Sequence, residues 1–169
     1  MARTLGILFT WTTYGKWLRG DARGWVDEGK VFPRNQTLMS TDRRRLRYSP
    51  FVFPRRQRHV AGHLVGKAVA KLGGEVYALC VASWHIHLVT GYVHVDVSDL
   101  TKTVKETVRT GLAYRRAIWA QGFDKRFCFD VESLANRIRY ARRHNLEDGL
   151  PADPWPFIHL PPLLKPLVP

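Results

Sequence analysis

One stretch in the middle of the chain constrains its fold more than any other. An apolar run over residues 76–82 is followed, after one serine, by Trp-His-Ile-His-Leu-Val, which opens a second apolar run. Runs of this length and composition predict two successive strands, over 75–82 and 85–93. Because successive side chains of a strand point to opposite faces, His85 and His87 share one face, while the apolar residues beside them share the other.

The paired histidines suggest a metal site. Neutral imidazole is the commonest metal ligand among side chains, and a strand holds both donors in place before an ion arrives. The alternative is that both imidazoles are partly buried and bonded to backbone carbonyl groups for purely structural reasons. The pair alone leaves both interpretations open.

The charge balance of the chain indicates a polyanionic partner. Its 169 residues suit one domain, and 27 Lys and Arg against 14 Asp and Glu give a formal net charge of +13. Such an excess on a small domain is typical of nucleic-acid binding, because neutralising phosphates releases counterions. An anionic membrane surface is the alternative.

A membrane protein or a disulfide scaffold is not expected. No apolar run approaches the roughly 20 residues that span a bilayer, and the N-terminus lacks the features of a secretory signal. The only cysteines, Cys80 and Cys128, are far apart and form no CxxC pair, so we expect neither a disulfide framework nor a thiolate zinc site. These features favour a cytoplasmic protein.

A first strand over 4–13 is followed by a long loop over 14–27 that is rich in glycine and tryptophan. Aromatic rings interleaved with cations are typical of a single-stranded nucleic-acid groove, where rings stack on bases and cations contact phosphates. The alternative is a loop that its tryptophans pin to the domain. The residues we expect to contact nucleic acid here are Lys16, Trp17, Arg19 and Arg23.

A basic segment follows near residues 43–58, which we expect to be largely helical after cap candidates at Ser40 and Thr41. Apolar spacing after Pro54 predicts a helix over 54–72. Either a phosphate-contacting surface or a solvated helix face explains the charge, and the density of arginine favours the first. The expected contacts are Arg43, Arg44, Arg45, Arg47, Arg55, Arg56 and Arg58.

Two further histidines, His59 and His63, lie four residues apart in the predicted helix over 54–72. That spacing is able to chelate a metal. Without the glutamate of an HExxH arrangement the signal is weak, so we interpret both as surface residues.

The C-terminal half predicts a helix over 98–118 opened by Ser98 and Asp99, a short strand over 127–129, and a helix from about 130–133 to His144 or Asn145. A Pro-rich tail over 151–169 follows the domain of residues 1–150 and is expected to wrap its surface.

In the last of these helices the apolar stripe leaves Tyr140 outside the core-facing side. His144 lies one turn beyond Tyr140, and Arg137 lies on the same flank.

Together these residues resemble those of a known family. A His-hydrophobic-His strand, a following helix, and a lone tyrosine with a polar residue four positions later are similar to the HUH nucleases, and more closely to the single-tyrosine transposases, including the REP-associated tyrosine transposases of bacteria. The resemblance extends over about residues 5–148. It is carried further by Phe-Thr-Trp-Thr-Thr-Tyr-Gly at 9–15, Gly-Asp at 20–21, Gly-Trp at 24–25, and Ser-Leu and Ile-Arg-Tyr before and at position 140.

The resemblance implies an α+β, ferredoxin-like fold, the HUH endonuclease fold, with an antiparallel sheet packed by helices. It also implies a divalent ion, Mg²⁺ or Mn²⁺, bound by His85, His87 and a third ligand. That ligand is His144 by position, where the family usually has Gln or Asn, and Asn145 is the substitute. An imidazole there favours softer ions such as Mn²⁺.

The resemblance further implies that Tyr140 is the nucleophile that cuts and rejoins single-stranded DNA near a stem-loop through a covalent phosphotyrosine. Arg137, the ion or a water is expected to assist the tyrosine. Trp84, where many relatives have Asn, is expected to stack on a base.

Two other functions stay open. One is a domesticated protein, catalytically impaired, that still binds hairpin DNA, and the other is an RNA-binding domain, which the strand pattern does not favour. A monomer and a homodimer are both compatible with the family, and such a protein would associate with the bacterial nucleoid through DNA.

Overall fold

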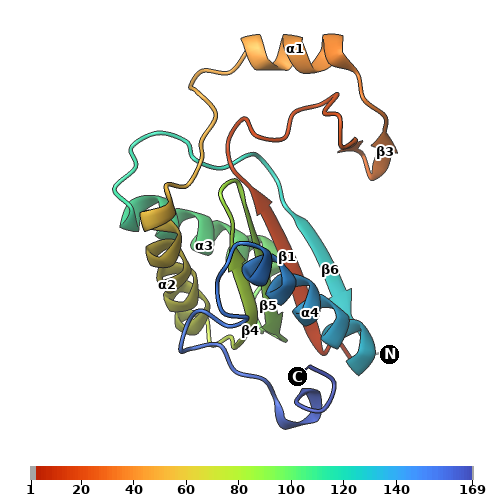
Figure 1. Cartoon of the computed structure of the whole chain (residues 1–169), viewed down its shortest axis with the longest axis vertical. Helices are drawn as coiled ribbons and strands as arrows, with labels where there is room; N and C mark the ends of the chain where they lie inside the picture. Colours follow the sequence, from red (N-terminus) through yellow and green to blue (C-terminus); the bar gives the residue numbers. More distant parts are fainter. Residues whose placement is uncertain (1–2, 169) are drawn as a thin grey trace.

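A four-stranded antiparallel sheet forms the centre of the computed structural model, which describes residues 3–168 (Figure 1). The strand order is β4-β5-β1-β6, so β5 lies beside β1, its hairpin partner β4 forms one edge of the sheet, and β6 forms the other edge. The strands are β1 (Gly6–Thr12), β4 (Val76–Val81), β5 (His85–Gly91) and β6 (Asp124–Cys128).

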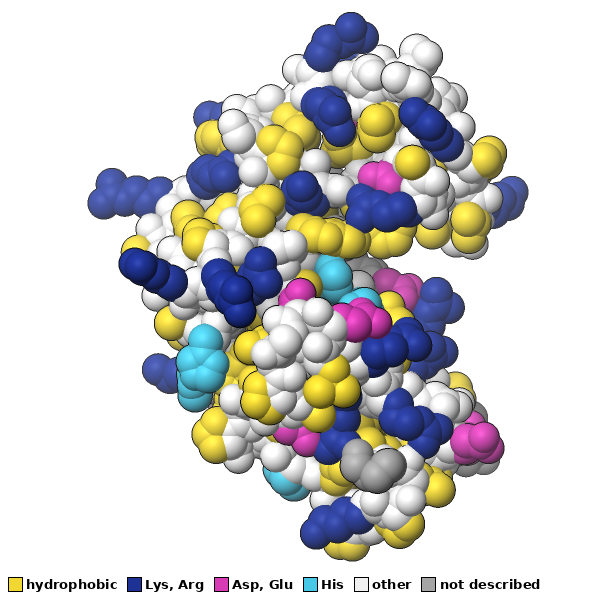
Figure 2. Space-filling view, viewed as in Figure 1, with side chains coloured by type: hydrophobic (Ala, Val, Ile, Leu, Met, Phe, Trp, Pro, Cys, Tyr) yellow, Lys and Arg dark blue, Asp and Glu magenta, His cyan; other side chains and the backbone are white. Residues whose placement is uncertain are grey.

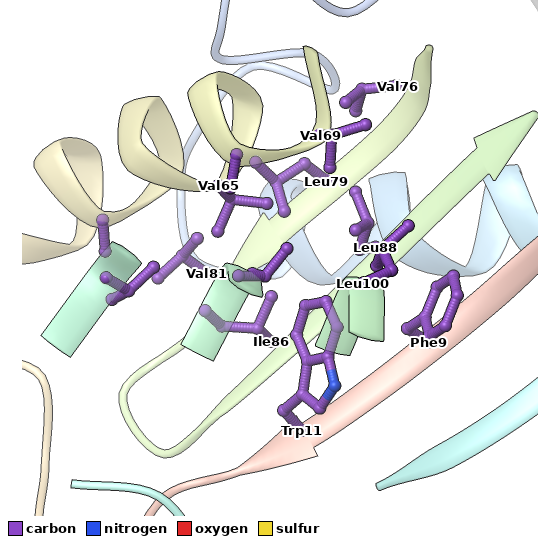
Figure 3. Close-up of a cluster of buried hydrophobic side chains, with 14 of the residues drawn as sticks. Phe9, Trp11, Val65, Val69, Val76, Leu79, Val81, Ile86, Leu88 and Leu100 are labelled. Carbon is purple, nitrogen blue, oxygen red and sulfur yellow. The ribbon is translucent and has the colours of Figure 1, made fainter. Parts of the chain in front are cut away.

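Helices cover both faces of this sheet. On one face α2 (Arg55–Lys71) and α3 (Val97–Gly111) pack over a core that Figure 3 shows in part, with Phe9, Trp11 and Leu88 against Val65 and Leu100. Covering both faces explains why every residue of β4 is buried and why its sequence is a continuous apolar run.

On the opposite face α4 (Val131–Glu147) packs over a second core. Leu134 and Ile138 of α4 contact the layer formed by Leu8 and Val89 of the sheet. The odd and even residues of β5 therefore face different helices, which is the alternation that the sequence predicts for this strand.

The chain between β1 and α2 forms a lobe above the sheet (Figure 1). It contains a small hairpin of β2 (Trp25–Asp27) and β3 (Lys30–Phe32) and the helix α1 (Gln36–Arg44). The turn of the hairpin uses Glu28 and Gly29, both with positive φ. The expected loop over 14–27 therefore ends in a strand.

The basic segment near 43–58 is not one helix, which corrects the sequence prediction. Asn35, not Ser40 or Thr41, caps α1, and its side chain accepts a hydrogen bond from the amide of Leu38. Residues 45–54 lie between α1 and α2 without regular structure. Prolines at positions 50 and 54 explain the interruption, because proline lacks the amide hydrogen and disfavours helix in the residue before it.

The helix predicted over 98–118 also differs. Its N-cap is Asp96, which accepts a hydrogen bond from the amide of Ser98, and it ends at Gly111. A β-carbon at Gly111 would lie 2.6 Å from the side chain of Leu64 in α2, so the glycine permits close packing of the two helices. Beyond it Ala113 has a φ of 59°, which breaks the helix.

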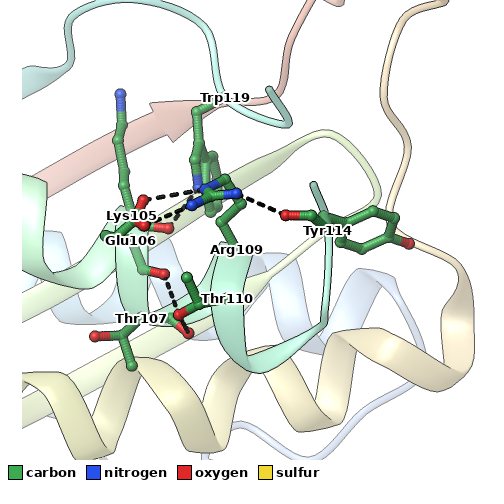
Figure 4. Close-up of polar contacts among 7 residues, drawn as sticks. All are labelled: Lys105, Glu106, Thr107, Arg109, Thr110, Tyr114 and Trp119. Atoms are coloured by element: carbon green, nitrogen blue, oxygen red, sulfur yellow. Dashed lines mark hydrogen bonds and ion pairs between the residues drawn. The ribbon is translucent and has the colours of Figure 1, made fainter. Parts of the chain in front are cut away.

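Side chains of α3 hold the segment that follows it (Figure 4). The Arg109 guanidinium donates to the carbonyl of Tyr114, and the Trp119 indole donates to the carbonyl of Lys105. The Lys105 ammonium donates to the carbonyls of Ala120 and Gly122. These bonds satisfy backbone groups of a segment without its own regular structure.

The C-terminal tail runs along the surface and also enters both cores. Trp155 is buried against α2, while Leu164 of the 3₁₀ turn Pro162–Leu164 and Val168 join the second core beneath α4. None of the helices in residues 3–168 is both long and apolar enough to cross a bilayer.

Candidate metal centre and active site

Three histidines from two elements meet on the α4 face of the sheet. His85 and His87 project from β5 towards α4, and His144 of α4 lies opposite them. The ring centroids are 4.6 Å apart for His85 and His87, 5.4 Å for His85 and His144, and 4.9 Å for His87 and His144. One ligand nitrogen from each ring lies within 4.8 Å of the other two, which is close enough for one ion.

The ring nitrogens of this triad are largely without protein partners. Both nitrogens of His85 and Nε2 of His144 are shut off from solvent and make no hydrogen bond within residues 3–168. Buried polar atoms are normally bonded, so each such atom calls for an explanation. An ion ligated by these nitrogens would satisfy them, and the residues therefore fit a bound divalent metal. An all-nitrogen set suits Mn²⁺ better than Mg²⁺.

Burial keeps the two strand histidines neutral. Burial, together with the smaller effect of the neighbouring imidazoles, lowers the pKa of His85 to about 4 and the pKa of His87 to about 3, because charged rings would be desolvated and would repel one another. A neutral imidazole is the form that ligates metal, so both donors are ready at neutral pH without losing a proton.

Tyr140 lies against the triad, one helical turn before His144. Its ring centroid is 5.0 Å from that of His87 and 4.8 Å from that of His144. The Arg143 guanidinium lies 5.5 Å from the centre of the Tyr140 ring. Within residues 3–168 no group hydrogen-bonds the Tyr140 hydroxyl, which leaves the hydroxyl available to a substrate.

Two other residues predicted near the site have contacts elsewhere. The Asn145 amide donates to the carbonyls of Leu79 and Ala152, at 2.8 and 2.9 Å, and so joins α4 to β4 and the tail. Arg137 lies beside the Cys128 thiol, where burial raises the pKa of the thiol and the guanidinium opposes that rise.

Figure 2 shows histidine side chains at the bottom of a hollow between the lobe that carries α1 and the body that carries α4. An aromatic and arginine stack lies at this junction. The Arg23 guanidinium is 4.4 Å from the centre of the Trp84 ring and 5.3 Å from that of Trp17. The Trp84 ring in turn lies 4.4 Å from that of His85. The loop is thus pinned beside the triad.

Two of the arginines predicted to contact DNA are paired within the protein. Arg19 donates to both carboxylate oxygens of Asp42 on α1, and Arg23 donates to both oxygens of Asp21. These contacts pin the loop to the domain beside the triad, as one of the two alternatives for this loop predicts.

The remaining predicted cations lie on α1, on the segment after it and at the start of α2. A guanidinium nitrogen of Arg58 lies 3.5 Å from a carboxylate oxygen of Asp148, and the Arg47 guanidinium lies over the Tyr48 ring. Within residues 3–168 no side-chain partner is found for the half-buried Lys16 or for the exposed cations Arg44, Arg55 and Arg56.

Thr10 of β1, which no sequence pattern singles out, has its hydroxyl 2.9 Å from Nδ1 of His87. Strand alternation places Thr10 on one face of β1, but only the pairing of β1 with β5 places it opposite His87. A partner on Nδ1 orients the ring and directs Nε2 towards an ion, as is usual around metal-ligating histidines.

No family model matches the chain, and no curated protein is significantly similar to it. Among solved structures it is similar to that of a REP-associated tyrosine transposase bound to a REP hairpin, with 14% sequence identity, a TM-score of 0.54, and coverage of 93% of this chain and 78% of that chain. The similarity shows that the two chains share their overall fold, a mixed α+β arrangement with an antiparallel sheet packed by helices.

Proposed function

We propose that the chain is a metal-dependent single-stranded DNA endonuclease and strand transferase of the single-tyrosine HUH type, with DNA hairpins as its substrate. The observation that carries this proposal is the contact of Tyr140 with a triad of histidines whose ligand atoms lie within 4.8 Å of one another. A nucleophile beside a cation site is what phosphodiester cleavage requires, because the negative charge of the phosphate repels attack.

The order of elements supports the ferredoxin-like fold that this type of enzyme has. Apart from the lobe, the chain runs β1-α2-β4-β5-α3-β6, which is the β-α-β-β-α-β pattern. The fold shared with a transposase in complex with a REP hairpin supports the family and the hairpin substrate.

In this proposal Tyr140 supplies the nucleophilic oxygen. The hydroxyl loses its proton and attacks the phosphorus, the bond to the 3′ oxygen breaks, and that oxygen takes up a proton to give a free 3′-hydroxyl. The phosphotyrosine keeps the energy of the broken bond, so attack by a 3′-hydroxyl reverses the reaction and joins strands. The Arg143 guanidinium over the Tyr140 ring helps to hold the side chain in position.

His85, His87 and His144 would hold the divalent ion, Mn²⁺ or Mg²⁺. The ion, when bound, neutralises and orients the scissile phosphate. Thr10 keeps His87 in the tautomer that presents Nε2. Trp84, which packs on His85, would stack on a base next to the cleaved bond.

The lobe and the start of α2 supply the DNA-binding surface in this proposal. Exposed cations without internal partners, such as Arg44 and Arg55, would contact phosphates, while Arg19 and Arg23 shape the loop that carries Trp17. Phosphate contacts of this kind supply affinity and register without reading the sequence.

The test is incubation of the protein with 3′-labelled, hairpin-bearing single-stranded DNA in Mn²⁺ or Mg²⁺, followed by a denaturing gel. The label is at the 3′ end because the tyrosine stays bonded to the phosphate of the 3′ fragment. We expect a metal-dependent covalent adduct that Tyr140→Phe abolishes, while hairpin binding is retained because only the hydroxyl is removed. Tyr92→Phe, which removes the exposed hydroxyl of the tyrosine that follows β5, is the matched control and is expected to keep the adduct.

His144 suggests a second candidate function, because the family that the chain resembles usually has Gln or Asn at this position. In this alternative the chain binds hairpin DNA but no longer cleaves it. Tight binding without an adduct across several hairpins and both ions would favour it. If the adduct formed with His144→Gln and not with the unmodified chain, the histidine at position 144 would be the cause of the lost cleavage.

A further inference from the structure

A further pair of histidines lies apart from the triad, on the exposed side of α2. His59 and His63 are one helical turn apart, both side chains are exposed, and their Nε2 atoms are 3.1 Å from each other. Two imidazole nitrogens that bind one ion at 2.0–2.1 Å are separated by about 2.9 to 3.4 Å, depending on the angle at the metal. The Nε2 atoms of His59 and His63 are therefore already at the separation that two ligands of one ion have.

The tail holds both rings in this arrangement. The His59 ring is stacked on Trp155, with centroids 5.9 Å apart and planes 16° apart, and the His63 ring lies edge-on to Phe157 at 6.0 Å. The Trp155 indole also donates to the backbone carbonyl of His59. Rings fixed by packing lose less conformational entropy when they bind an ion, so this pair is better organised than two free histidines.

The tail reaches these histidines because α2 has glycine where its rings pack. A β-carbon at Gly62 would lie 2.0 Å from the Trp155 ring, and one at Gly66 would lie 2.5 Å from the Phe157 ring. Glycine at both positions lets the aromatic rings lie directly on the helix backbone, beside His59 and His63. The histidine pair and the docked tail therefore form one structural unit.

The surroundings of the pair indicate which ions it would take. The sequence of α2 contains no acidic residue, whereas Arg55, Arg56 and Lys67 are basic. Hard ions such as Mg²⁺ and Ca²⁺ need oxygen ligands, and two imidazoles do not supply them. Ions that form strong bonds to neutral nitrogen, namely Zn²⁺, Ni²⁺ and Cu²⁺, suit two imidazoles with water in the other positions.

We propose that His59 and His63 form a second metal site, separate from the triad, which binds Zn²⁺, Ni²⁺ or Cu²⁺ through the two Nε2 atoms and fixes the C-terminal tail on α2. An ion that binds the rings in the orientation set by Trp155 and Phe157 stabilises the docked tail by linkage, since it binds less well when the rings are free. The competing interpretation is a hydrogen bond between the two imidazoles with no role for an ion.

Calorimetric titration of the full chain with Zn²⁺ tests the site. We expect two classes of binding site in the unmodified chain, because the triad also takes zinc. His63→Gln is expected to remove one class, or to weaken it by about tenfold or more through loss of the chelate. His94→Gln removes one exposed imidazole elsewhere and is expected to keep both classes.

Hydrogen exchange tests the coupling to the tail. The amide of His159 donates to the carbonyl of Val76 in β4, so its exchange reports whether this segment is docked. Zinc is expected to slow this exchange severalfold in the unmodified chain and to leave it unchanged in His63→Gln.

Two results would overturn the proposal. One is zinc binding in both His59→Gln and His63→Gln with the stoichiometry and affinity of the unmodified chain. The other is exchange of the His159 amide that does not respond to zinc while the second site is occupied. Neither readout uses DNA, so the result does not depend on the nuclease activity proposed above.

Discussion

The Thr10 hydroxyl of β1 lies 2.9 Å from Nδ1 of His87 of β5, a bond between residues 77 positions apart in the chain. When Nε2 of His87 ligates an ion, Nδ1 carries the proton and donates it to Thr10. Thr10→Val keeps the shape of the side chain and removes this partner. We expect metal affinity to fall by about 10- to 100-fold, as for other partners of metal-ligating histidines.

Manganese titration followed by calorimetry measures this effect, with Thr10→Ser as the control that keeps the hydroxyl. Serine is expected to retain most of the affinity. Equal affinity of the valine and serine variants would show that the hydroxyl does not orient His87.

The core of the candidate site could be predicted because its spacing is local. Strand alternation alone places His85 and His87 on one face, and helical spacing alone places Tyr140 and His144 side by side. These two local arrangements are the same however the strand and the helix pack in the fold. The structure adds the meeting of the two pairs, since α4 packs on the face of the sheet that carries the histidines.

Features that depend on distant pairing could not be predicted. The register that sets Thr10 opposite His87 is decided by the packing of whole strands. The β2 and β3 strands have three residues each, too short for a periodic signal. Glycine at position 62 lowers the helix propensity of the sequence of α2. The structure explains this glycine, because the Trp155 ring packs directly on it.

Stability is expected to fall as the pH falls from neutral, because the buried histidines resist protonation. The pKa of His85 is lowered to about 4 and that of His87 to about 3, against about 6.5 in the unfolded chain. Between these values the unfolded chain binds more protons than the folded chain, so the free energy of unfolding rises with pH. Each histidine contributes about 1.5 kcal/mol between pH 5 and pH 6.5.

Urea denaturation with a chelator present, at several pH values from 5 to 7, measures this slope. His85→Asn is expected to flatten it, whereas His94→Gln, which changes an exposed histidine, is expected to leave it as it is. A slope that does not change in His85→Asn would contradict the assignment of a buried neutral imidazole.

Cations with and without internal partners are expected to differ in the salt dependence of DNA binding. Arg55 has no side-chain partner within residues 3–168, so a phosphate contact by it releases a counterion. Arg55→Gln is expected to lower the slope of log affinity against log salt by about 0.7 to 0.9. Arg19, which donates twice to Asp42, is expected to contribute little to that slope.

Hairpin binding measured by fluorescence anisotropy over a range of salt concentrations distinguishes the two, with Arg19→Gln beside Arg55→Gln. Equal changes of slope in both variants would mean that the Arg19 and Asp42 pair opens when DNA binds.

Because the tail packs on α2, one glycine-to-alanine substitution in this helix is expected to lower the free energy of unfolding instead of raising it. Alanine in place of glycine inside a helix normally stabilises it by about 1 kcal/mol. At Gly62, however, the new β-carbon would lie 2.0 to 2.4 Å from three atoms of the buried Trp155 indole. Overpacking of this kind costs about 1 to 3 kcal/mol, so Gly62→Ala is expected to lower the free energy of unfolding.

A double-mutant cycle with Trp155→Ala separates the clash from the helix propensity. Once the indole is absent, Gly62→Ala has open space, and the expected effect turns neutral or stabilising by up to about 1 kcal/mol. Urea denaturation of the four proteins gives the coupling between the two sites. If Gly62→Ala stabilises the chain with Trp155 present, the indole does not pack on this glycine, and the docking of the tail that orients His59 loses its basis.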